Sequence, residues 1–183
     1  SQKGDITANN NWAIGWASAN GHFEIVKYLV SQGADITADD NYAVKYSSEN
    51  GHLETVKFLI SQGADIAAEF DHAIRCAASN GHLETVKYLV SQGANITANN
   101  NWAVLLASCN GHIETVKYLV ASRADVTADN NAVRWASYNG HLEIVKYLVS
   151  LGADKDIAID YAYSHRKTSI VQYLVSLGVK RPQ

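Results

Sequence analysis

The sequence lacks several features that would place it in other classes of protein. Only two of its 183 residues are cysteine, Cys76 and Cys109, too few for a small secreted fold held by disulfides. No apolar run approaches the roughly 20 residues that cross a bilayer, and the first residues do not resemble a signal peptide. We therefore expect two reduced, partly buried thiols in a cytoplasmic or nuclear protein that does not engage a membrane.

The sequence also lacks methionine and an excess of positive charge. No methionine occurs, even at the first position, and the only proline is Pro182. We interpret the chain as part of a longer polypeptide. The formal net charge of −3 provides no basic field for nucleic acid or an anionic surface. The hydrophobic fraction of 47% is that of a folded protein rather than a disordered one.

What the sequence does contain is an internal repeat. Asn-Gly-His recurs at 20–22, 50–52, 80–82, 110–112 and 139–141. A fixed period of about 30 residues indicates a stacked array, in which each unit contacts its neighbours. The predicted units are 5–34, 35–64, 65–94, 95–124, 125–153 and a C-terminal cap, 154–183, all within one repeat domain.

Each unit predicts two short helices. In the second unit, residues 42–50 form the first helix and residues 52–62 the second. Asn41 is the expected N-cap, because its side-chain carbonyl can accept hydrogen bonds from the amides of the first turn. Gly51 and Gly63 are expected to end the helices, since glycine adopts the left-handed conformation without a Cβ penalty.

The second helix of each unit is amphipathic. Leu53, Val56 and Leu59 form an apolar stripe with Ile60 at three- and four-residue spacing. The opposite face carries pairs of glutamate and lysine three residues apart, which favours a solvated face with weak ion pairs. These pairs are Glu24/Lys27, Glu54/Lys57, Glu84/Lys87, Glu114/Lys117 and Glu143/Lys146.

The repeated segments resemble ankyrin repeats. Residues 80–94, Asn-Gly-His-Leu-Glu-Thr-Val-Lys-Tyr-Leu-Val-Ser-Gln-Gly-Ala, are similar to the second half of an ankyrin repeat. Asp-Ile-Thr-Ala at 35–38 resembles the closing D-V-N-A of the family. The resemblance covers essentially the whole chain. It implies an all-α solenoid of six stacked helix-turn-helix units and a non-catalytic protein–protein interaction scaffold.

The repeats also depart from the family pattern. Ankyrin repeats usually have 33 residues, whereas these units have about 30. The missing residues fall between Asp-Ile-Thr-Ala and the first helix, where the family projects a β-hairpin finger, so we expect shortened hairpin loops. In detail, the units resemble those of ankyrin arrays from large amoeba-infecting DNA viruses, which implies a partner from the host cell.

Positions that vary between units are not fixed by stacking, and four of them form columns in the first helices. The first column contains Trp12, Tyr42, His72 and Trp102. The second contains Gly15, Lys45, Arg75, Leu105, Arg134 and Asp160. The third contains Trp16, Tyr46, Cys76, Leu106, Trp135 and Tyr161. The fourth contains Ala19, Glu49, Ser79, Cys109, Tyr138 and Ser164.

These columns lie three, four and seven residues apart, so they share one side of the helix. Aromatic residues and arginine are typical of interaction hot spots. We predict a partner-binding surface, the first-helix face, which includes one turn residue, Phe70. Its members are Trp12, Tyr42, His72, Trp102, Lys45, Arg75, Leu105, Arg134, Glu49, Tyr138 and Phe70.

Two interpretations stay open within these columns. The Trp16 column is either binding surface or packing between repeats. Phe70 is either a contact point or a harmless exposed side chain, since its equivalents are turn-type residues. We expect the Lys45 and Glu49 columns to be exposed, because charged residues are rarely buried without a partner.

Other functions have less support. The repeated histidines, such as His52 and His82, occur once per unit, too far apart to share zinc, and a role in tying down the inter-helix turn is favoured. No catalytic motif or phosphate loop is present, so we expect no enzyme, cofactor, metal or small-molecule substrate. Lys45, Arg75 and Arg134 near aromatics could imitate a stacking groove for nucleic acid. The alternative function is a structural or self-associating spacer without a specific partner.

Overall fold

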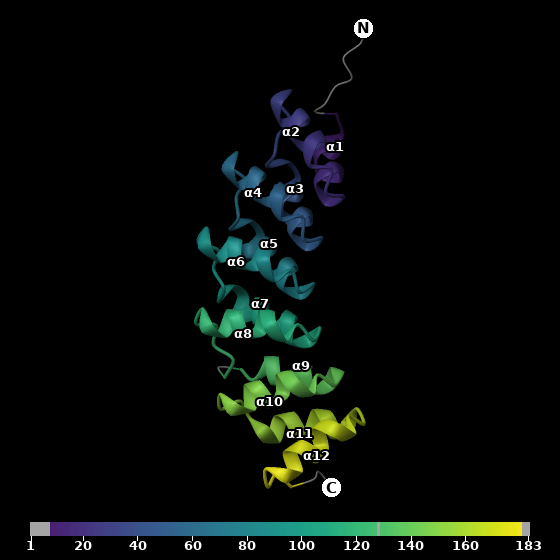
Figure 1. Ribbon diagram of the computed structural model, residues 1–183, viewed down its shortest axis with the longest axis vertical. Coiled ribbons are helices and arrows are strands. Elements are labelled where there is room, and N and C mark those ends of the chain that lie inside the picture. Colours follow the sequence, from purple (N-terminus) through teal and green to yellow (C-terminus); the bar gives the residue numbers. More distant parts are fainter. Residues whose placement is uncertain (1–7, 128, 181–183) are drawn as a thin grey trace. The chain divides into compact units, whose positions relative to one another are not determined.

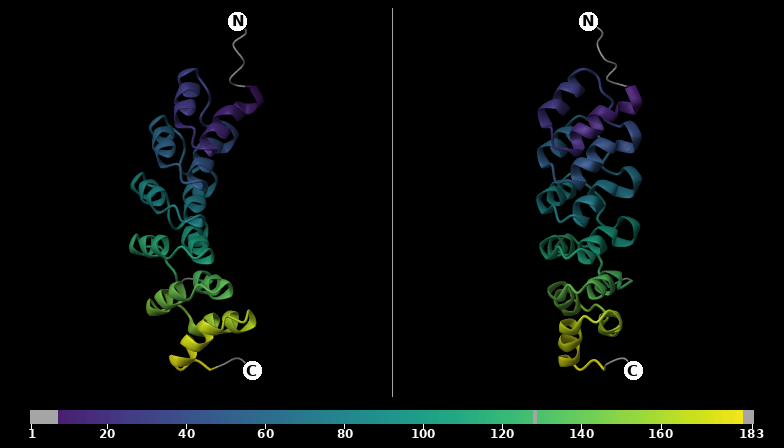
Figure 2. Two further views of the ribbon diagram at one scale, coloured as in Figure 1. Left: turned by 45° about the vertical axis from the view of Figure 1, so that its right-hand side comes forward. Right: turned by 90° about the vertical axis from the view of Figure 1, so that its right-hand side faces the viewer.

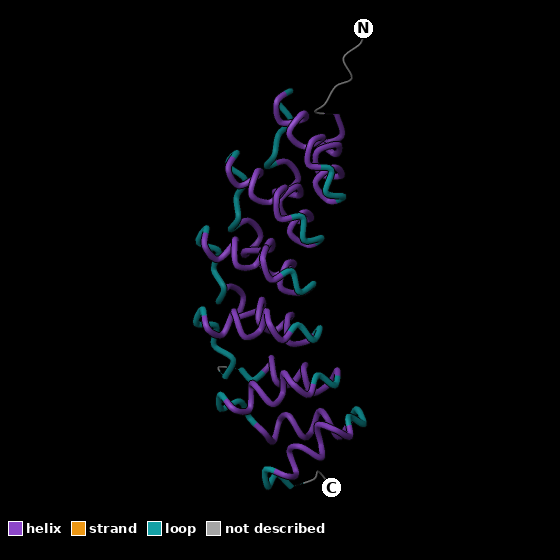
Figure 3. Tube along the Cα trace, in the orientation of Figure 1, coloured by secondary structure: helices purple, strands orange, loops and turns teal. Residues whose placement is uncertain are grey.

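The computed structural model describes residues 8–127 and 129–180, which belong to two compact units, Ser1–Asn95 and Ile96–Gln183. The described residues form helices and connecting loops without strands (Figure 3). Unit 1 contains α1 (Ala8–Ala19), α2 (Phe23–Ser31), α3 (Ala38–Glu49), α4 (Leu53–Ser61), α5 (Ala68–Ser79) and α6 (Leu83–Ser91). Unit 2 contains α7 (Ala98–Cys109), α8 (Ile113–Ala121), α9 (Asn131–Asn139), α10 (Leu142–Ser150), α11 (Lys155–Ser164) and α12 (Thr168–Ser176).

Within each unit the helices stack as antiparallel pairs. The first helices α1, α3 and α5 form one layer of unit 1, and the second helices α2, α4 and α6 form the other (Figures 1 and 2). Unit 2 repeats the arrangement with α7, α9 and α11 beside α8, α10 and α12. Successive first helices pack more extensively than successive second helices. The predicted all-α stack of helix pairs is confirmed.

The apolar stripe of each second helix supplies the core. Val56 and Leu59 of α4 are both 0% exposed, whereas Leu53 and Ile60 at the edges of the stripe are half-buried. Fully burying such a side chain contributes about 1.5–3 kcal/mol. A single helix pair leaves this stripe uncovered, so stability depends on stacking. The glutamate–lysine pairs lie on the exposed side, as predicted, with N···O distances of 2.7 to 3.3 Å.

A left-handed turn opens the first helix. In α3, Asp39, Asp40 and Asn41 have φ angles of 54°, 55° and 61°, so the right-handed helix starts at Tyr42. Residues 99–101 of α7 repeat this conformation. Asparagine and aspartate tolerate the left-handed region better than other residues that carry a side chain. This polar turn occupies the place where a finger would project.

The expectation that Asn41 caps its own helix is wrong. Its Oδ1 accepts a hydrogen bond from the amide of Asp65, in the next repeat, at 2.8 Å. The left-handed backbone of Asn41 takes the side chain away from the first-turn amides. We call this contact the inter-repeat Asx bond. It joins Asn11 to Asp35, Asn41 to Asp65 and Asp71 to Asn95 in unit 1, and Asn101 to Asp125 and Asn130 to Asp154 in unit 2.

The Asn-Gly-His motif links repeats in a second way. Gly51 ends α3 with a φ of +72°, as predicted, and a Cβ placed on it would lie 2.5 Å from Nδ1 of His82. The histidine of one repeat therefore occupies the space left by the glycine of the repeat before it. His52 also places Nε2 3.1 Å from the carbonyl oxygen of Ala19, at the end of the preceding first helix. The histidine thus holds the neighbouring repeat as well as its own turn.

Replacing Gly51 with alanine is expected to lower the free energy of unfolding more than replacing Gly63. Both glycines have positive φ, +72° and +98°, so each alanine introduces about 1–2 kcal/mol of backbone strain. Only at Gly51 does the new methyl meet a ring, because nothing lies within 4 Å of the Cβ position at Gly63. Overpacking then adds about 1–3 kcal/mol. Urea unfolding of the two variants measures the difference.

The control for this prediction is a double-mutant cycle. His82→Ala removes the ring that the new methyl meets. It should therefore lower the free energy of unfolding less in the Gly51→Ala variant than in the original chain. Equal losses for Gly51→Ala and Gly63→Ala would show that the glycine–histidine contact does not constrain the stack.

Candidate functional site

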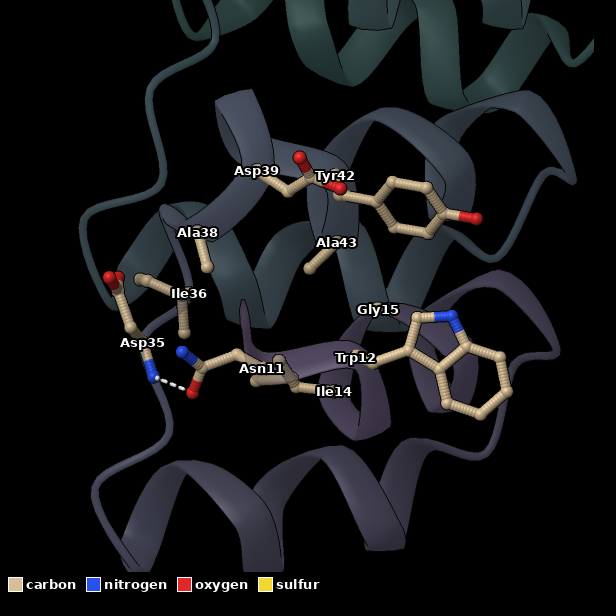
Figure 4. Close-up of a pocket in the computed structure, with 10 residues that line it drawn as sticks. All are labelled: Asn11, Trp12, Ile14, Gly15, Asp35, Ile36, Ala38, Asp39, Tyr42 and Ala43. Atoms are coloured by element: carbon tan, nitrogen blue, oxygen red, sulfur yellow. Dashed lines mark hydrogen bonds between the residues drawn. The ribbon is translucent and has the colours of Figure 1, made fainter. Parts of the chain in front are cut away.

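Two tryptophans dominate the first-helix side of unit 1. Trp12 and Trp16 of α1 are 60% and 50% exposed, and their ring centroids lie 5.6 Å apart. In Figure 4, Trp12 projects from α1 on the same side as Tyr42 from α3. The third column, which contains Trp16, therefore contributes exposed surface at this end of the unit.

Tyr42 has a different environment. Its ring packs over Gly15 of the preceding repeat, where an added Cβ would lie 2.6 Å from Cδ1 (Figure 4). It also contacts Tyr46, with ring centroids 4.0 Å apart. Burial raises the pKa of the Tyr42 hydroxyl above its ordinary value. Tyr42 is half-buried and joins two repeats, so it supports the surface more than it extends it.

The cavity beside Tyr42 is too small for a ligand. Its volume is about 20 Å³, and residues of the first two repeats line it, including Asn11, Trp12 and Gly15 (Figure 4). One water occupies roughly this much space. The arrangement offers a surface for contact rather than a pocket for a small molecule.

The expected exposure of the second column is wrong at two positions. Arg75 is only 9% exposed. The Lys45 side chain is 17% exposed, because its Nζ lies 2.8 Å from Oε2 of Glu69 in the next repeat. The same oxygen lies 3.0 Å from Nδ1 of His72. A carboxylate from the neighbouring loop allows the lysine to be largely buried. Leu105, Arg134 and Glu49, in the second and fourth columns, are half-buried.

Protonation in this cluster follows from the ion pair. The hydrogen bond from Lys45 lowers the pKa of the Glu69 carboxyl. Burial by itself would lower the pKa of Lys45, but the hydrogen bond and charge of Glu69 outweigh it and raise that pKa. Burial and the positive charge of Lys45 lower the pKa of His72, although Glu69 opposes them. At neutral pH the cluster is therefore an ion pair beside a neutral imidazole.

Unit 2 presents its own aromatic surface. Trp102 of α7 is 43% exposed, and Trp135 and Tyr138 of α9 are 38% and 36% exposed. Five side chains from α9, α11 and the residue directly after α11 make a chain of contacts that we call the α9–α11 cluster. Its members are Arg134, Trp135, Tyr138, Tyr161 and His165.

Sequence reasoning left several of these residues out. Trp16 and Trp135 lie in the third column, which could not be assigned to surface or packing from its residue types. Glu69 and His165 lie outside the columns or in the divergent last repeat, and only the three-dimensional contacts show them. The side chain of Phe70 lies outside the described residues.

The two cysteines are half-buried, as expected, and neither forms a disulfide. Burial raises the pKa of the Cys76 thiol to about 11. A thiol of this kind stays protonated at neutral pH and is a poor nucleophile. Within residues 8–127 and 129–180, no three histidine, cysteine, aspartate or glutamate side chains gather as a metal site. In the same ranges no helix has the length and apolarity needed to span a membrane.

Helix pairs that stack in two layers define a helical repeat protein. A family model for ankyrin repeats, containing three copies, matches residues 2–70, 46–130 and 74–159. The chain therefore belongs to the ankyrin-repeat family, as its resemblance implied. Ankyrin repeats are generally protein–protein interaction modules, and the fold is typically non-catalytic.

The fold is also similar to a solved structure. The crystal structure of the human ASB11 ankyrin repeat domain matches with a TM-score of 0.82 and 20% sequence identity. The match covers 91% of this chain and 84% of that chain. No curated protein matches the sequence. The structural likeness concerns the fold, so the surface of this chain must be interpreted from its own residues.

Replacing Glu69 with glutamine is expected to lower the free energy of unfolding at neutral pH by up to about 1 kcal/mol, since half of Lys45's ion pair is lost. The folded-state pKa of Glu69 is lowered from 4.5. The ionised Glu69 therefore contributes fully to the free energy of unfolding above pH 4.5. This contribution is lost as the pH falls through the lower folded-state pKa. Urea unfolding of the original chain and the variant tests this: their free energies of unfolding should differ at pH 7 and become similar near pH 3.

Glu54→Gln provides the matched control, because Glu54 also pairs with a lysine at 2.8 Å but within one helix and with a more exposed partner. It should cost only about 0.3 kcal/mol. A Glu69→Gln effect that is no larger than this, or that persists unchanged at low pH, contradicts a structural role for the Lys45–Glu69 pair.

Proposed function

We propose that this chain is a protein–protein interaction scaffold that binds a partner through the first-helix side of its repeats. The observation that carries the proposal is the exposure of Trp12 and Trp16 in direct contact with each other. Transfer of a large aromatic side chain from water into an interface is favourable. Tryptophan is also among the residues most enriched in interaction hot spots.

The proposed surface differs in detail from the sequence-based set. Trp12 and Trp16 would be the anchors in unit 1, and Trp102, Trp135 and Tyr138 those in unit 2. Tyr42, Lys45 and Arg75 would act as support, because packing or burial removes most of their surface. Buried neighbours of this kind hold exposed anchors in fixed positions, which reduces the entropy lost on binding.

The proposed partner is a cytoplasmic or nuclear protein. This location agrees with the two free thiols, of which Cys76 is half-buried and protonated at neutral pH. The resemblance of the shortened units to viral arrays adds the hypothesis that the partner belongs to the host cell. This part of the proposal rests on the resemblance alone.

Replacing Trp12 and Trp16 together with alanine is expected to weaken partner capture by at least about tenfold, because hot-spot truncations commonly cost 2 kcal/mol or more. The two indoles are exposed, so the thermal unfolding midpoint should change little. Affinity capture from a cell lysate with quantitative mass spectrometry compares the proteins bound by the variant and the original chain.

Tyr28→Ala is the matched control, since Tyr28 of α2 is 62% exposed on the second-helix side. It should leave the captured proteins unchanged. If Tyr28→Ala removes the same proteins, or if the double tryptophan variant retains them all, the proposed side is wrong. Specific capture of only the chain itself, with dimers seen by light scattering, would favour the self-associating spacer.

A further inference from the structure

The α9–α11 cluster is a chain of four aromatic rings with one guanidinium at its end. The ring centroids of Trp135 and Tyr138 lie 5.2 Å apart, and those of Tyr138 and His165 lie 3.9 Å apart. His165 stacks with Tyr161 at 6.5 Å, one helical turn away. Arg134 completes the group, with its guanidinium carbon 5.3 Å from the centre of the Tyr161 ring. Three of these residues belong to α9 and Tyr161 to α11, while His165 directly follows α11.

Arg134 is a cation without a carboxylate partner among the described residues. In the part of the chain that the structure describes, no acidic side chain forms an ion pair with it, and its buried Nε has no hydrogen-bond partner. The exposed Asp160 precedes Tyr161 but does not pair with Arg134. A half-buried guanidinium that lies against a ring retains unused donors in a fixed plane.

The equivalent cation in unit 1 shows what is missing. Lys45 occupies the same column and is neutralised by Glu69 from the loop of the next repeat at 2.8 Å. That loop is shorter in the last repeat, where Asp154 caps α11 directly by accepting from the amides of Asp156 and Ile157. Glu69 has a left-handed φ of 50°, and no residue at the start of α11 has this conformation. The fifth repeat therefore keeps a cation at this position, Arg134, while the last repeat lacks the acid that would pair with it.

We propose that the α9–α11 cluster binds an acidic peptide segment of a partner protein, in which an aspartate or glutamate precedes or follows an aromatic or aliphatic residue. This inference rests on the proposed function and names the chemistry of the partner. The partner carboxylate takes the place that Glu69 has beside Lys45 and pairs with the Arg134 guanidinium. The neighbouring apolar side chain packs on Trp135 and Tyr138, which are exposed.

The surrounding charges favour this occupant. Arg166 is exposed, and Lys167 extends along the surface of Gly140, with Cδ 3.2 Å from the position of a Cβ there. Arg166 and Lys167 directly follow His165 in the sequence, so two further cations flank the cluster. Nδ1 of His165 lies 3.0 Å from the carbonyl oxygen of Tyr161, so Nδ1 donates and Nε2 can accept a hydrogen bond from a backbone amide of the peptide. Complementary charge increases both the association rate and the specificity.

Selection of random peptides displayed on phage against the full chain tests this inference. The enriched peptides should contain Asp or Glu beside an aromatic or aliphatic residue. Synthetic versions of these peptides, and versions with Gln or Asn in place of the acid, are then titrated by isothermal calorimetry. The amide versions should bind at least about tenfold more weakly, because a charge-assisted hydrogen bond is worth more than a neutral one.

Arg134→Gln should weaken the binding of the acidic peptides to the affinity of their amide versions. Arg134→Lys keeps the charge but removes the planar fork, and it should restore only part of the affinity. Arg123→Gln is the control, since Arg123 is exposed in the loop after α8 and its loss changes the net charge equally. Circular dichroism establishes that each variant is folded.

The outcomes separate this inference from the proposed function. The inference is overturned if the selected peptides bind the first-helix side without preferring acids. It is also overturned if acidic peptides bind the Arg134→Gln variant as well as the original chain, or if Arg123→Gln lowers their affinity equally. Each of these results leaves the scaffold function standing. A selection that enriches no peptide at all contradicts both.

Discussion

The inter-repeat Asx bond is the contact on which the geometry of each unit depends. The side-chain oxygen of Asn41 accepts the amide of Asp65, and the same spacing of 24 residues recurs in both units. The bond satisfies a loop amide that would otherwise need water and sets the distance between consecutive repeats. The left-handed conformation of the accepting asparagine or aspartate places its side chain where it can reach the next repeat. It is found at Asn11, Asn41, Asp71, Asn101 and Asn130.

The glycine–histidine contact fixes the other end of the same helix. Gly51 both ends α3 and leaves room for His82, so one residue serves the local turn and the stacking. With both ends of the first helices held, their facing sides come close enough for Tyr42 to cover Gly15 and for Lys45 to reach Glu69. The side chains that remain outside this packing, such as Trp12 and Trp135, form the surface that we assign to partners.

Local regularities of the sequence predicted much of this fold. The helix pairs, the glycines at their ends and the rows of glutamate and lysine follow from spacing within one repeat. The partner of Asn41, the burial of Lys45 and the exposure of Trp16 could not be predicted in this way. The first two depend on a residue 24 positions away, which stacking brings close. The third depends on how much of the indole the neighbouring repeat covers, which residue types do not reveal. Arg134 was named as a site residue, but its missing acid became visible only by comparison with Lys45 and Glu69.

Amide hydrogen exchange at Asp65 tests the central role of the inter-repeat Asx bond most directly. Asn41→Gly removes the accepting oxygen and still permits the left-handed backbone at φ 61°. The account predicts that the Asp65 amide exchanges slowly in the original chain, although this residue is exposed, and much faster in the variant. The amide of Asp35, held by Asn11, should stay protected in both. Fast exchange at Asp65 in the original chain, or equal exchange in the two proteins, would contradict the account.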